Sequence, residues 1–162
     1  MLTTESGYLP QKTEIQSNFP ASIEEVVLSG TIVNNINKIW YSKRDIATAN
    51  KVMKELDLFD IKNKCFRDLS GGQQQRVLIA RAICATEKVI ILDEPTNGLD
   101  PAISTQIYEI LERLNKKRGL TVIMVSHDIS RAIKYCSRVM EIKDGKVTYL
   151  GDAKSYKGGG VA

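Results

Sequence analysis

Long apolar runs are missing from this sequence, and so are clustered cysteines and histidines. No run approaches the roughly 20 apolar residues that a membrane-spanning helix needs. The 3 cysteines, Cys65, Cys84 and Cys136, stand far apart without a CxxC motif, and His127 is the only histidine. This pattern argues against a structural zinc site, and we expect buried free thiols in a reducing cytosol.

A strong excess of one charge is also missing. Lys and Arg total 23 against 19 Asp and Glu, a net charge of +4, and the basic residues are interleaved with acids. Such mild, mixed charge argues against nucleic acid as a partner. The start, MLTTESGYLP, lacks the basic region and the apolar core of a signal peptide. The 162 residues have the length and composition of one globular domain.

Glycines stand at one predicted helix start. Ser70-Gly71-Gly72 directly precedes a helical pattern whose residues, beginning with Val77, recur at spacings of three and four. Glycine leaves backbone N–H groups uncovered at a helix N-terminus, where the macrodipole favours negative charge. The pattern predicts an anion cradle suited to a phosphate. A glycine turn with a serine cap is the plain alternative.

A buried strand ends in two acids. Val89 to Leu92 is a continuous apolar run, typical of a strand covered on both faces in a parallel sheet. Asp93 and Glu94 follow at the carboxyl end, where open α/β sheets bind ligands. Adjacent strand residues point to opposite faces, so we expect one acid to hold Mg²⁺ and the other to act on the attacking water. Alone, the pair is equally compatible with a structural role.

In combination, these motifs resemble the ATP-binding subunits of ABC transporters. The sequence carries LSGGQ at Leu69–Gln73, DEP at Asp93–Pro95, GLD at Gly98–Asp100, and His127 after a further apolar strand. Their order and spacing match the family from Leu69 to His127. The resemblance implies an α/β fold, namely a partial P-loop NTPase core with a parallel sheet, an α-helical signature subdomain and a C-terminal β-hairpin.

The resemblance also implies a role for each motif residue. Asp93 is expected to be the Walker B carboxylate that holds Mg²⁺ through water, Glu94 the catalytic carboxylate and His127 the switch histidine. The expected nucleotide-binding residues are the signature residues and the D-loop acid: Ser70, Gly71, Gly72, Gln73 and Asp100.

The first residues of the chain provide two further signals. Gly7-Tyr8-Leu9 predicts a short strand that ends before Pro10. Gln11 is by composition a loop glutamine, whereas the resemblance makes it the Q-loop residue that reaches Mg²⁺ and binds the nucleotide. Phe19 to Val27 resembles the ATPases of zinc and manganese transporters, where this region faces the permease. Local core is the plain alternative for its apolar residues.

Helix signals follow on both sides of the motifs. Ser22 or a neighbour is expected to cap a short helix, and Ser42 with Asp45 resembles a capping box. The second of these helices has an apolar stripe that we interpret as core, formed by Ile46, Ala49, Met53 and Leu56. Asp100 with Pro101 predicts the start of a further helix, which ends at Gly119. Its expected buried face comprises Ile103, Ile107, Ile110, Leu111 and Leu114.

The last third predicts two more elements of the core. Thr121 to Val125 is expected to be a second buried strand, delivering His127 to the same edge as the acids, and a short helix follows from Ile129 to Tyr135. Asp144-Gly145 predicts a hairpin turn. The expected divisions are 1–21 for the Q-loop and its lead-in, 22–86 for the helical subdomain, 87–151 for the rest of the ATPase core, and 152–162 for a flexible tail.

No phosphate-binding loop of the form G-x-x-x-x-G-K-[ST] occurs in the sequence. The family places that loop upstream of the Q-loop, so the resemblance covers the carboxyl-terminal two thirds of an ABC ATPase. ATP and Mg²⁺ are the implied cofactors, with Asp93 and Gln11 near the metal. Without the loop, we expect this chain to hold Mg-ATP poorly, to have little or no ATPase activity, and to self-associate through uncovered sheet edges.

The function implied is an ATPase that couples hydrolysis to zinc or manganese import. Its expected partners are a membrane permease and a second ATPase subunit, paired head to tail. Its expected location is the cytoplasmic side of the cell membrane, held peripherally by the permease. Two alternatives stay open: a soluble ABC ATPase of another process, such as DNA repair or translation, and a non-catalytic module that supplies LSGGQ to another subunit.

Overall fold

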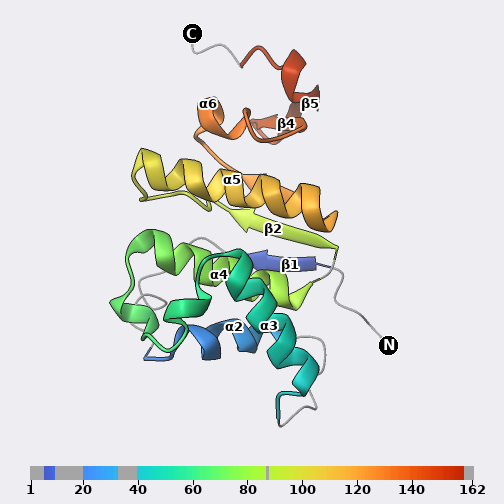
Figure 1. Cartoon of the computed structure of the whole chain (residues 1–162). Coiled ribbons are helices and arrows are strands. Elements are labelled where there is room, and N and C mark those ends of the chain that lie inside the picture. Colours follow the sequence, from blue (N-terminus) through green and yellow to red (C-terminus); the bar gives the residue numbers. More distant parts are fainter. Residues whose placement is uncertain (1–5, 10–19, 33–39, 87, 159–162) are drawn as a thin grey trace. The chain divides into compact units, whose positions relative to one another are not determined.

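The structure is a computed structural model that describes residues 6–9, 20–32, 40–86 and 88–158 (Figure 1). The chain divides into two compact units, residues 1–125 and 126–162. Gln11, Phe19 and the expected Q-loop lie outside the described residues. No helix within the described segments is both long and apolar enough to cross a membrane.

The first unit is built on a parallel sheet. Strands β1 (Ser6–Leu9), β2 (Val89–Asp93) and β3 (Thr121–Val125) lie in the order β1-β2-β3, with β2 in the centre. Ile90 is aligned with Gly7 on one side and Val122 on the other. Parallel neighbours require crossover connections, which helices provide here. The prediction of an α/β fold with a parallel sheet is therefore confirmed.

Helices connect these strands. Figure 1 shows α2, α3 and α4 grouped beside β1, with α5 running along the strands. The elements between the strands are α2 (Ile23–Ile32), α3 (Lys43–Glu55), the short 3₁₀ turns η1 (Phe59–Ile61) and η2 (Phe66–Asp68), α4 (Gly71–Ala85) and α5 (Pro101–Arg118).

Local signals place the helix ends. The helices α2, α3 and α4 each begin with a reciprocal capping box, in which a serine pairs with the residue three positions later. Asp100 caps α5 and Pro101 is its first residue, while Gly119 ends it with a left-handed φ of 66°. The predicted caps are therefore confirmed.

The described core covers one face of the sheet. Ile90 and Leu92 of β2 are fully buried, and Val122 and Met124 of β3 pack against the same core. On the opposite face, Ile123 is 48% and Val125 is 55% exposed. The prediction that β3 is a buried strand was therefore wrong, because among the described strands β3 pairs only with β2, and alternate side chains face away from the core.

The same one-sided packing corrects the prediction for β2. Val89 and Ile91 are only half-buried, so the strand is not fully covered on both faces. In α3, Ala49, Met53 and Leu56 are buried as predicted, but Ile46 is exposed because it lies in the first turn, short of the core.

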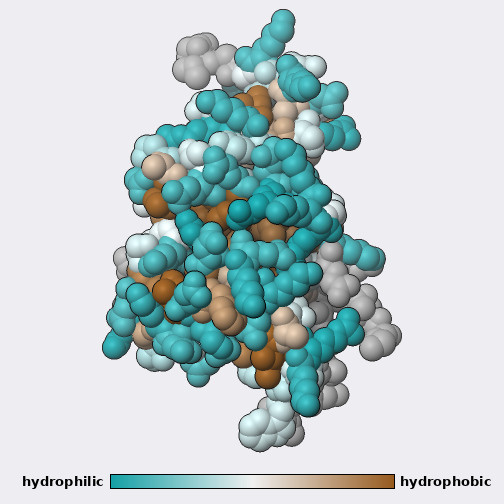
Figure 2. Space-filling view, viewed as in Figure 1, coloured by the Kyte–Doolittle hydropathy of each residue, from teal (hydrophilic) through white to brown (hydrophobic). Residues whose placement is uncertain are grey.

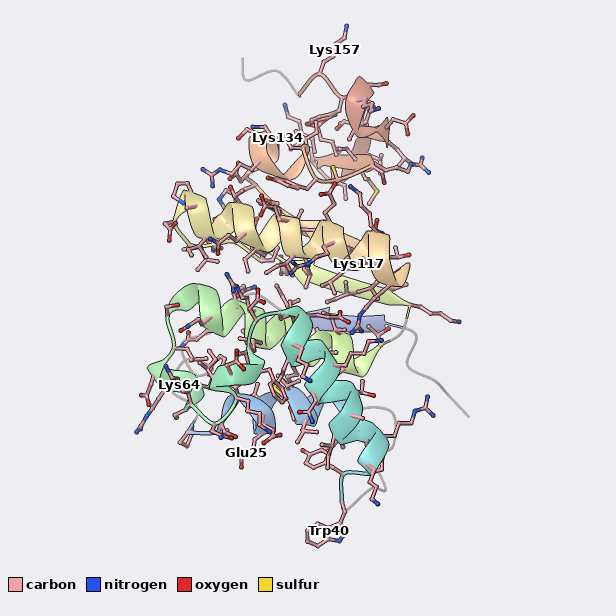
Figure 3. All side chains as sticks on the ribbon, viewed as in Figure 1. Glu25, Trp40, Lys64, Lys117, Lys134 and Lys157 are labelled. Atoms are coloured by element: carbon pink, nitrogen blue, oxygen red, sulfur yellow. The ribbon has the colours of Figure 1, made fainter. Side chains whose placement is uncertain are left out.

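Three further details concern the burial of residues in or near the helices. Ile23 and Val27 of α2 are completely buried, so the local-core alternative holds for these residues. The only tryptophan, Trp40, is 85% exposed and projects beyond the start of α3 (Figure 3). Ile103 of α5 is half-buried, whereas Ile107 and Leu111 are buried as expected.

The second unit is a hairpin with short helices. It contains α6 (Ile129–Ala132), β4 (Arg138–Lys143), β5 (Lys146–Asp152) and the 3₁₀ turn η3 (Ala153–Ser155). The helix ends at Ala132, and not at Tyr135 as predicted, because the chain continues in turns. The predicted hairpin is confirmed, and its turn places Asp144 and Gly145 at φ values of 51° and 73°.

The end of the hairpin is more structured than the sequence indicates. Ala153 is buried and its N–H donates to the carbonyl of Ser137. The hydroxyl of Tyr156 donates to Glu141 at 3.0 Å, and its ring stands edge-on to Tyr149. In the view of Figure 2, hydrophilic residues cover most of the surface, and an apolar patch is exposed over this hairpin. The exposed apolar side chains of the hairpin are Met140, Ile142, Val147 and Leu150.

Candidate functional site: a glycine-led helix start and two strand-end acids

The start of α4 retains two backbone donors. The Ser70 hydroxyl accepts from the N–H of Gln73 at 3.3 Å, and the Gln73 side-chain oxygen accepts from the N–H of Ser70 at 3.1 Å. The first regular helical bond is donated by Gln74 to the Ser70 carbonyl. The N–H groups of Gly71 and Gly72 have no acceptor among the described residues, as expected at a helix start. We refer to these two N–H groups as the cradle, and phosphate binding there stays a prediction.

This helix start differs from the others in its charge. The capping boxes of α2 and α3 are completed by the carboxylates Glu25 and Asp45, whereas that of α4 is completed by the neutral Gln73. At the start of α5, the Asp100 carboxylate itself accepts from the N–H groups of Ala102 and Ile103. A carboxylate at a helix start repels an incoming anion, and that of Asp100 also occupies two of the donors. Of these helix starts, that of α4 is therefore the best suited to a phosphate.

Glycine is required at the cradle by a close approach of α5. An ideal Cβ built on Gly72 would stand 2.5 Å from Cγ2 of Ile103, and one built on Gly71 would stand 3.2 Å from Cδ2 of Leu99. Since real Cβ atoms essentially never come within 3.0 Å of another atom, no larger residue fits at Gly72 without movement. The cradle and the first turn of α5 are thus packed directly against each other.

The two strand-end acids lie in different backbone settings. Asp93 is the last residue of β2, whereas Glu94 has already left the strand with a left-handed φ of 48°. The Glu94 N–H donates to the carbonyl of Val125 at the end of β3, and the Glu94 carbonyl accepts from Asn97. Both acids are half-buried. The alternation of a strand therefore stops at Asp93, and Glu94 is placed by the turn.

The turn from Glu94 to Asp100 is tied to α5. Thr96 is buried and its hydroxyl lies 3.0 Å from the hydroxyl of Tyr108, which is also buried. The N–H of Leu99 donates back to the carbonyl of Thr96. Asp100 then caps α5 through two hydrogen bonds of 3.0 Å. These bonds connect the strand-end acids to the helix start beside the cradle.

His127 lies in the second unit, just beyond β3. Its side chain is exposed, and the neighbouring Asp128 caps α6 and pairs with Arg131 at 3.0 Å. Asp93 and Glu94 belong to the first unit. The convergence of His127 with these acids stays a prediction, and the same holds for Gln11.

Sequence reasoning missed one polar link beside the cradle. Arg76 donates from Nη2 to the side-chain oxygen of Gln106 at 2.6 Å, and its Nη1 lies 4.0 Å from a carboxylate oxygen of Asp57. The link joins α4 to α5 one turn after Gly72 and Ile103. The helical spacing of four residues from Gly72 to Arg76 was the available signal, since both residues then face the same neighbour.

The residues present fit part of a site for Mg-ATP. Gly71 and Gly72 offer donors for a phosphate, and Asp93 and Glu94 offer the carboxylate oxygens that Mg²⁺ binds together with substrate phosphates. Within the described residues, no group of three or more His, Cys, Asp or Glu side chains gathers as a metal site. The glycines and the acids would therefore contribute separately to binding a nucleotide. The described residues do not form a closed metal centre.

Comparison with known proteins identifies the class. The family model described as "ABC transporter" matches residues 1–97. The chain therefore belongs to the ABC transporter family, as an ATP-binding domain, and its fold is that of the family's ATPase domains. The resemblance drawn from the motifs is confirmed.

The curated relatives are longer than this chain. A protein of Chlamydia muridarum named "Probable metal transport system ATP-binding protein" is 38% identical over 146 residues, which are 90% of this chain and 61% of the relative. The zinc uptake system ATP-binding protein ZurA of Listeria monocytogenes is 34% identical over 93% of the chain and 59% of the relative. The phosphonates import ATP-binding protein PhnC of Mesoplasma florum is 36% identical over 71% of the chain and 46% of the relative. The chain spans about three fifths of the length of the first of these.

Solved structures give the same result. An inward-facing metal-chelate type ABC transporter matches with a TM-score of 0.84 and 28% identity, over 93% of this chain and 60% of that chain. A dimeric ATP-binding cassette bound to ADP and Pi in a post-hydrolysis state matches with a TM-score of 0.72 and 31% identity, over 94% of this chain and 64% of that chain.

Proposed function

We propose that this chain is part of the ATPase subunit of an ABC importer and supplies the signature cradle to a nucleotide held by a second subunit. The observation that carries the proposal is the start of α4, where Gly71 and Gly72 present unpaired donors beside a neutral capping partner, Gln73. A helix start whose N–H groups have no acceptor suits a phosphate. The relation to a dimeric cassette bound to ADP and Pi supports this arrangement.

The acids would act on the nucleotide held in the same subunit. Glu94 would orient the attacking water and accept its proton, and Asp93 would hold Mg²⁺ through water, while His127 and Gln11 would contact the γ-phosphate and the metal. When bound, Mg-ATP supplies the phosphoryl group whose transfer to water drives the transporter. Asp100, fixed as the cap of α5, would organise the dimer interface beside the cradle.

The proposed partner is a membrane permease, which would hold the subunit at the cytoplasmic face of the cell membrane. Support comes from relatives named for metal transport and zinc uptake and from the metal-chelate type transporter. We propose a divalent metal ion, zinc or manganese, as the transported substrate. The phosphonate relative at similar identity is the competing assignment, and uptake of labelled zinc against labelled phosphonate by the complete transporter separates the two.

The chain itself is proposed to have little or no ATPase activity and to self-associate. No G-x-x-x-x-G-K-[ST] loop occurs in its sequence, so the phosphates lack their lysine and most of their backbone donors. The exposed sheet face at Ile123 and Val125 favours association between copies. A clean monomer at micromolar concentration by light scattering would contradict this association.

The cradle is tested by nuclear magnetic resonance on the ¹⁵N-labelled chain. Millimolar Mg-ATP is expected to shift the amides of Gly71 and Gly72, and to leave Ala102 and Ile103 unmoved because Asp100 already occupies their N–H groups. The variant Gln73→Glu keeps a capping box but adds a negative charge, so it should fold normally and lose the shifts. Shifts of equal size in wild type and Gln73→Glu would contradict the proposed role of the cradle.

A further inference from the structure

The cradle is not held by its own helix alone. A Cβ added to its glycines would meet Leu99, just before α5, and Ile103, in the first turn of α5, so the position of α4 relative to α5 decides where the two donors point. The same turn of α5 carries Asp100, whose carboxylate is fixed by Ala102 and Ile103. Ridges packed into grooves set the crossing of two helices, and a directional polar link adds a constraint on their alignment.

The link is formed by Arg76 and Gln106. The hydrogen bond from Nη2 to the side-chain oxygen of Gln106 measures 2.6 Å, and it lies one helical turn beyond the contact of Gly72 with Ile103 on both helices. The two contacts together therefore fix how α4 is aligned with α5. Sliding either helix by one residue would break the hydrogen bond and displace the glycine from Ile103.

Arg76 is placed there at an energetic cost. Its side chain is only 20% exposed, and its Nε is buried without a hydrogen-bond partner among the described residues. The Nη1 atom of Arg76 also lies 4.0 Å from a carboxylate oxygen of Asp57. Because the side chain of Asp57 is 73% exposed, this ion pair contributes little to stability. A half-buried guanidinium with an unsatisfied nitrogen contributes little to stability. This cost points to a positional role for Arg76.

We propose that Arg76 and Gln106 are positioning residues that align the signature cradle with the Asp100 turn of α5. The proposal rests on the function proposed above, since the alignment serves a phosphate that meets the cradle while Asp100 organises the interface. The pair acts through Gly71 and Gly72 and does not itself touch the nucleotide.

The test uses Gln106, which is exposed, so its replacement spares the core. In the ligand-free ¹⁵N-labelled chain, Gln106→Met is expected to move the amide signals of Gly71 and Gly72, and Arg76→Met should move them in the same direction. Gln106→Glu keeps the acceptor oxygen, so the amide signals of Gly71 and Gly72 should stay at their wild-type positions. The control is Arg113→Met, which removes a hydrogen bond of α5 to the Glu55 carbonyl at the end of α3, and it should leave both glycines unmoved.

A second readout links the pair to the ligand. Loss of one charge-assisted hydrogen bond is expected to weaken the Mg-ATP-dependent shifts of Gly71 and Gly72 about tenfold in Gln106→Met, with no weakening in Arg113→Met. Glycine signals that stay at their wild-type positions in Gln106→Met, or that move equally in Arg113→Met, would overturn the positioning role. Absence of any Mg-ATP effect in the wild type would instead contradict the proposed cradle, and the ligand-free comparison would still decide the alignment.

Discussion

Glu94 combines an unusual backbone conformation with a proposed catalytic role. Its φ of 48° is rare for a residue other than glycine, and the conformation is held by hydrogen bonds to Val125 and Asn97. Strain of this kind persists where the surroundings over-determine it, and it is concentrated at functional sites. The turn thus fixes the backbone of Glu94, from which the carboxylate side chain extends.

The strain predicts an asymmetry between substitutions. Glu94→Val should lower the free energy of unfolding by about 1–2 kcal/mol relative to Glu94→Asn, because a β-branched residue disfavours the left-handed region and asparagine tolerates it. Urea unfolding measures the difference. The same pair at Glu109, exposed on α5, should differ by less than about 0.5 kcal/mol. Equal stabilities of the two Glu94 variants would show that the turn carries no strain.

Cys84 is a second residue with a measurable signature. Burial raises the pKa of its thiol to about 12, against the opposing charge of Arg118. Because the folded-state pKa lies above the ordinary value of 9.0, the unfolded chain loses the proton first. Stability should therefore fall as the pH rises from about 9 towards 12.

The thiol also predicts a reactivity order. At mildly alkaline pH, iodoacetamide should modify the half-buried Cys65 well before Cys84, since only the thiolate of an accessible cysteine reacts. Mass spectrometry of timed samples gives the order. Modification of Cys84 at the rate of Cys65 in the folded chain would contradict the burial.

At the scale of elements, the contact of α4 with α5 is the critical one. Gly72→Ala should lower the free energy of unfolding by about 1–3 kcal/mol, because the new methyl group overlaps Ile103. Ile103→Ala should restore much of this loss in the double variant. The control is Gly71→Ala, which meets only the flexible end of Leu99 at 3.2 Å and should cost far less. Full additivity of Gly72→Ala and Ile103→Ala would contradict direct contact.

The sequence predicted the ends of these elements better than their faces. Caps and turns depend on a few neighbouring residues, so Ser42, Ser70, Asp100 and Asp144-Gly145 could be interpreted directly. Which face of a strand is covered depends on the partners of the whole sheet. The predicted burial of β3 was therefore wrong, although the segment was correctly predicted to be a strand.

The candidate site divides in the same way. The cradle, the strand-end acids and Asp100 were found from motifs, because each motif is a short segment with its own chemistry. The link of Arg76 to Gln106 joins residues 30 positions apart, and the helical spacing from Gly72 to Arg76 indicates the facing helix but not the partner residue on it. The left-handed backbone of Glu94 was missed because strand alternation was assumed to continue past Asp93.

At the scale of the whole molecule, the chain contains some parts of the proposed nucleotide site. It presents the cradle and the strand-end acids, while its sequence contains no loop to wrap the β- and γ-phosphates. It spans 61% of the length of the Chlamydia muridarum relative. These facts together favour a nucleotide that is bound mainly by residues other than those described.

Calorimetric titration of Mg-ATP into the 162-residue chain tests this account most directly. Two amide donors and two carboxylates are expected to give no saturable binding tighter than a Kd of about 1 mM, because so few contacts do not offset the cost of association. A Kd in the micromolar range would mean that the chain forms a complete phosphate site of its own, and would contradict the assignment of the cradle to a nucleotide held elsewhere.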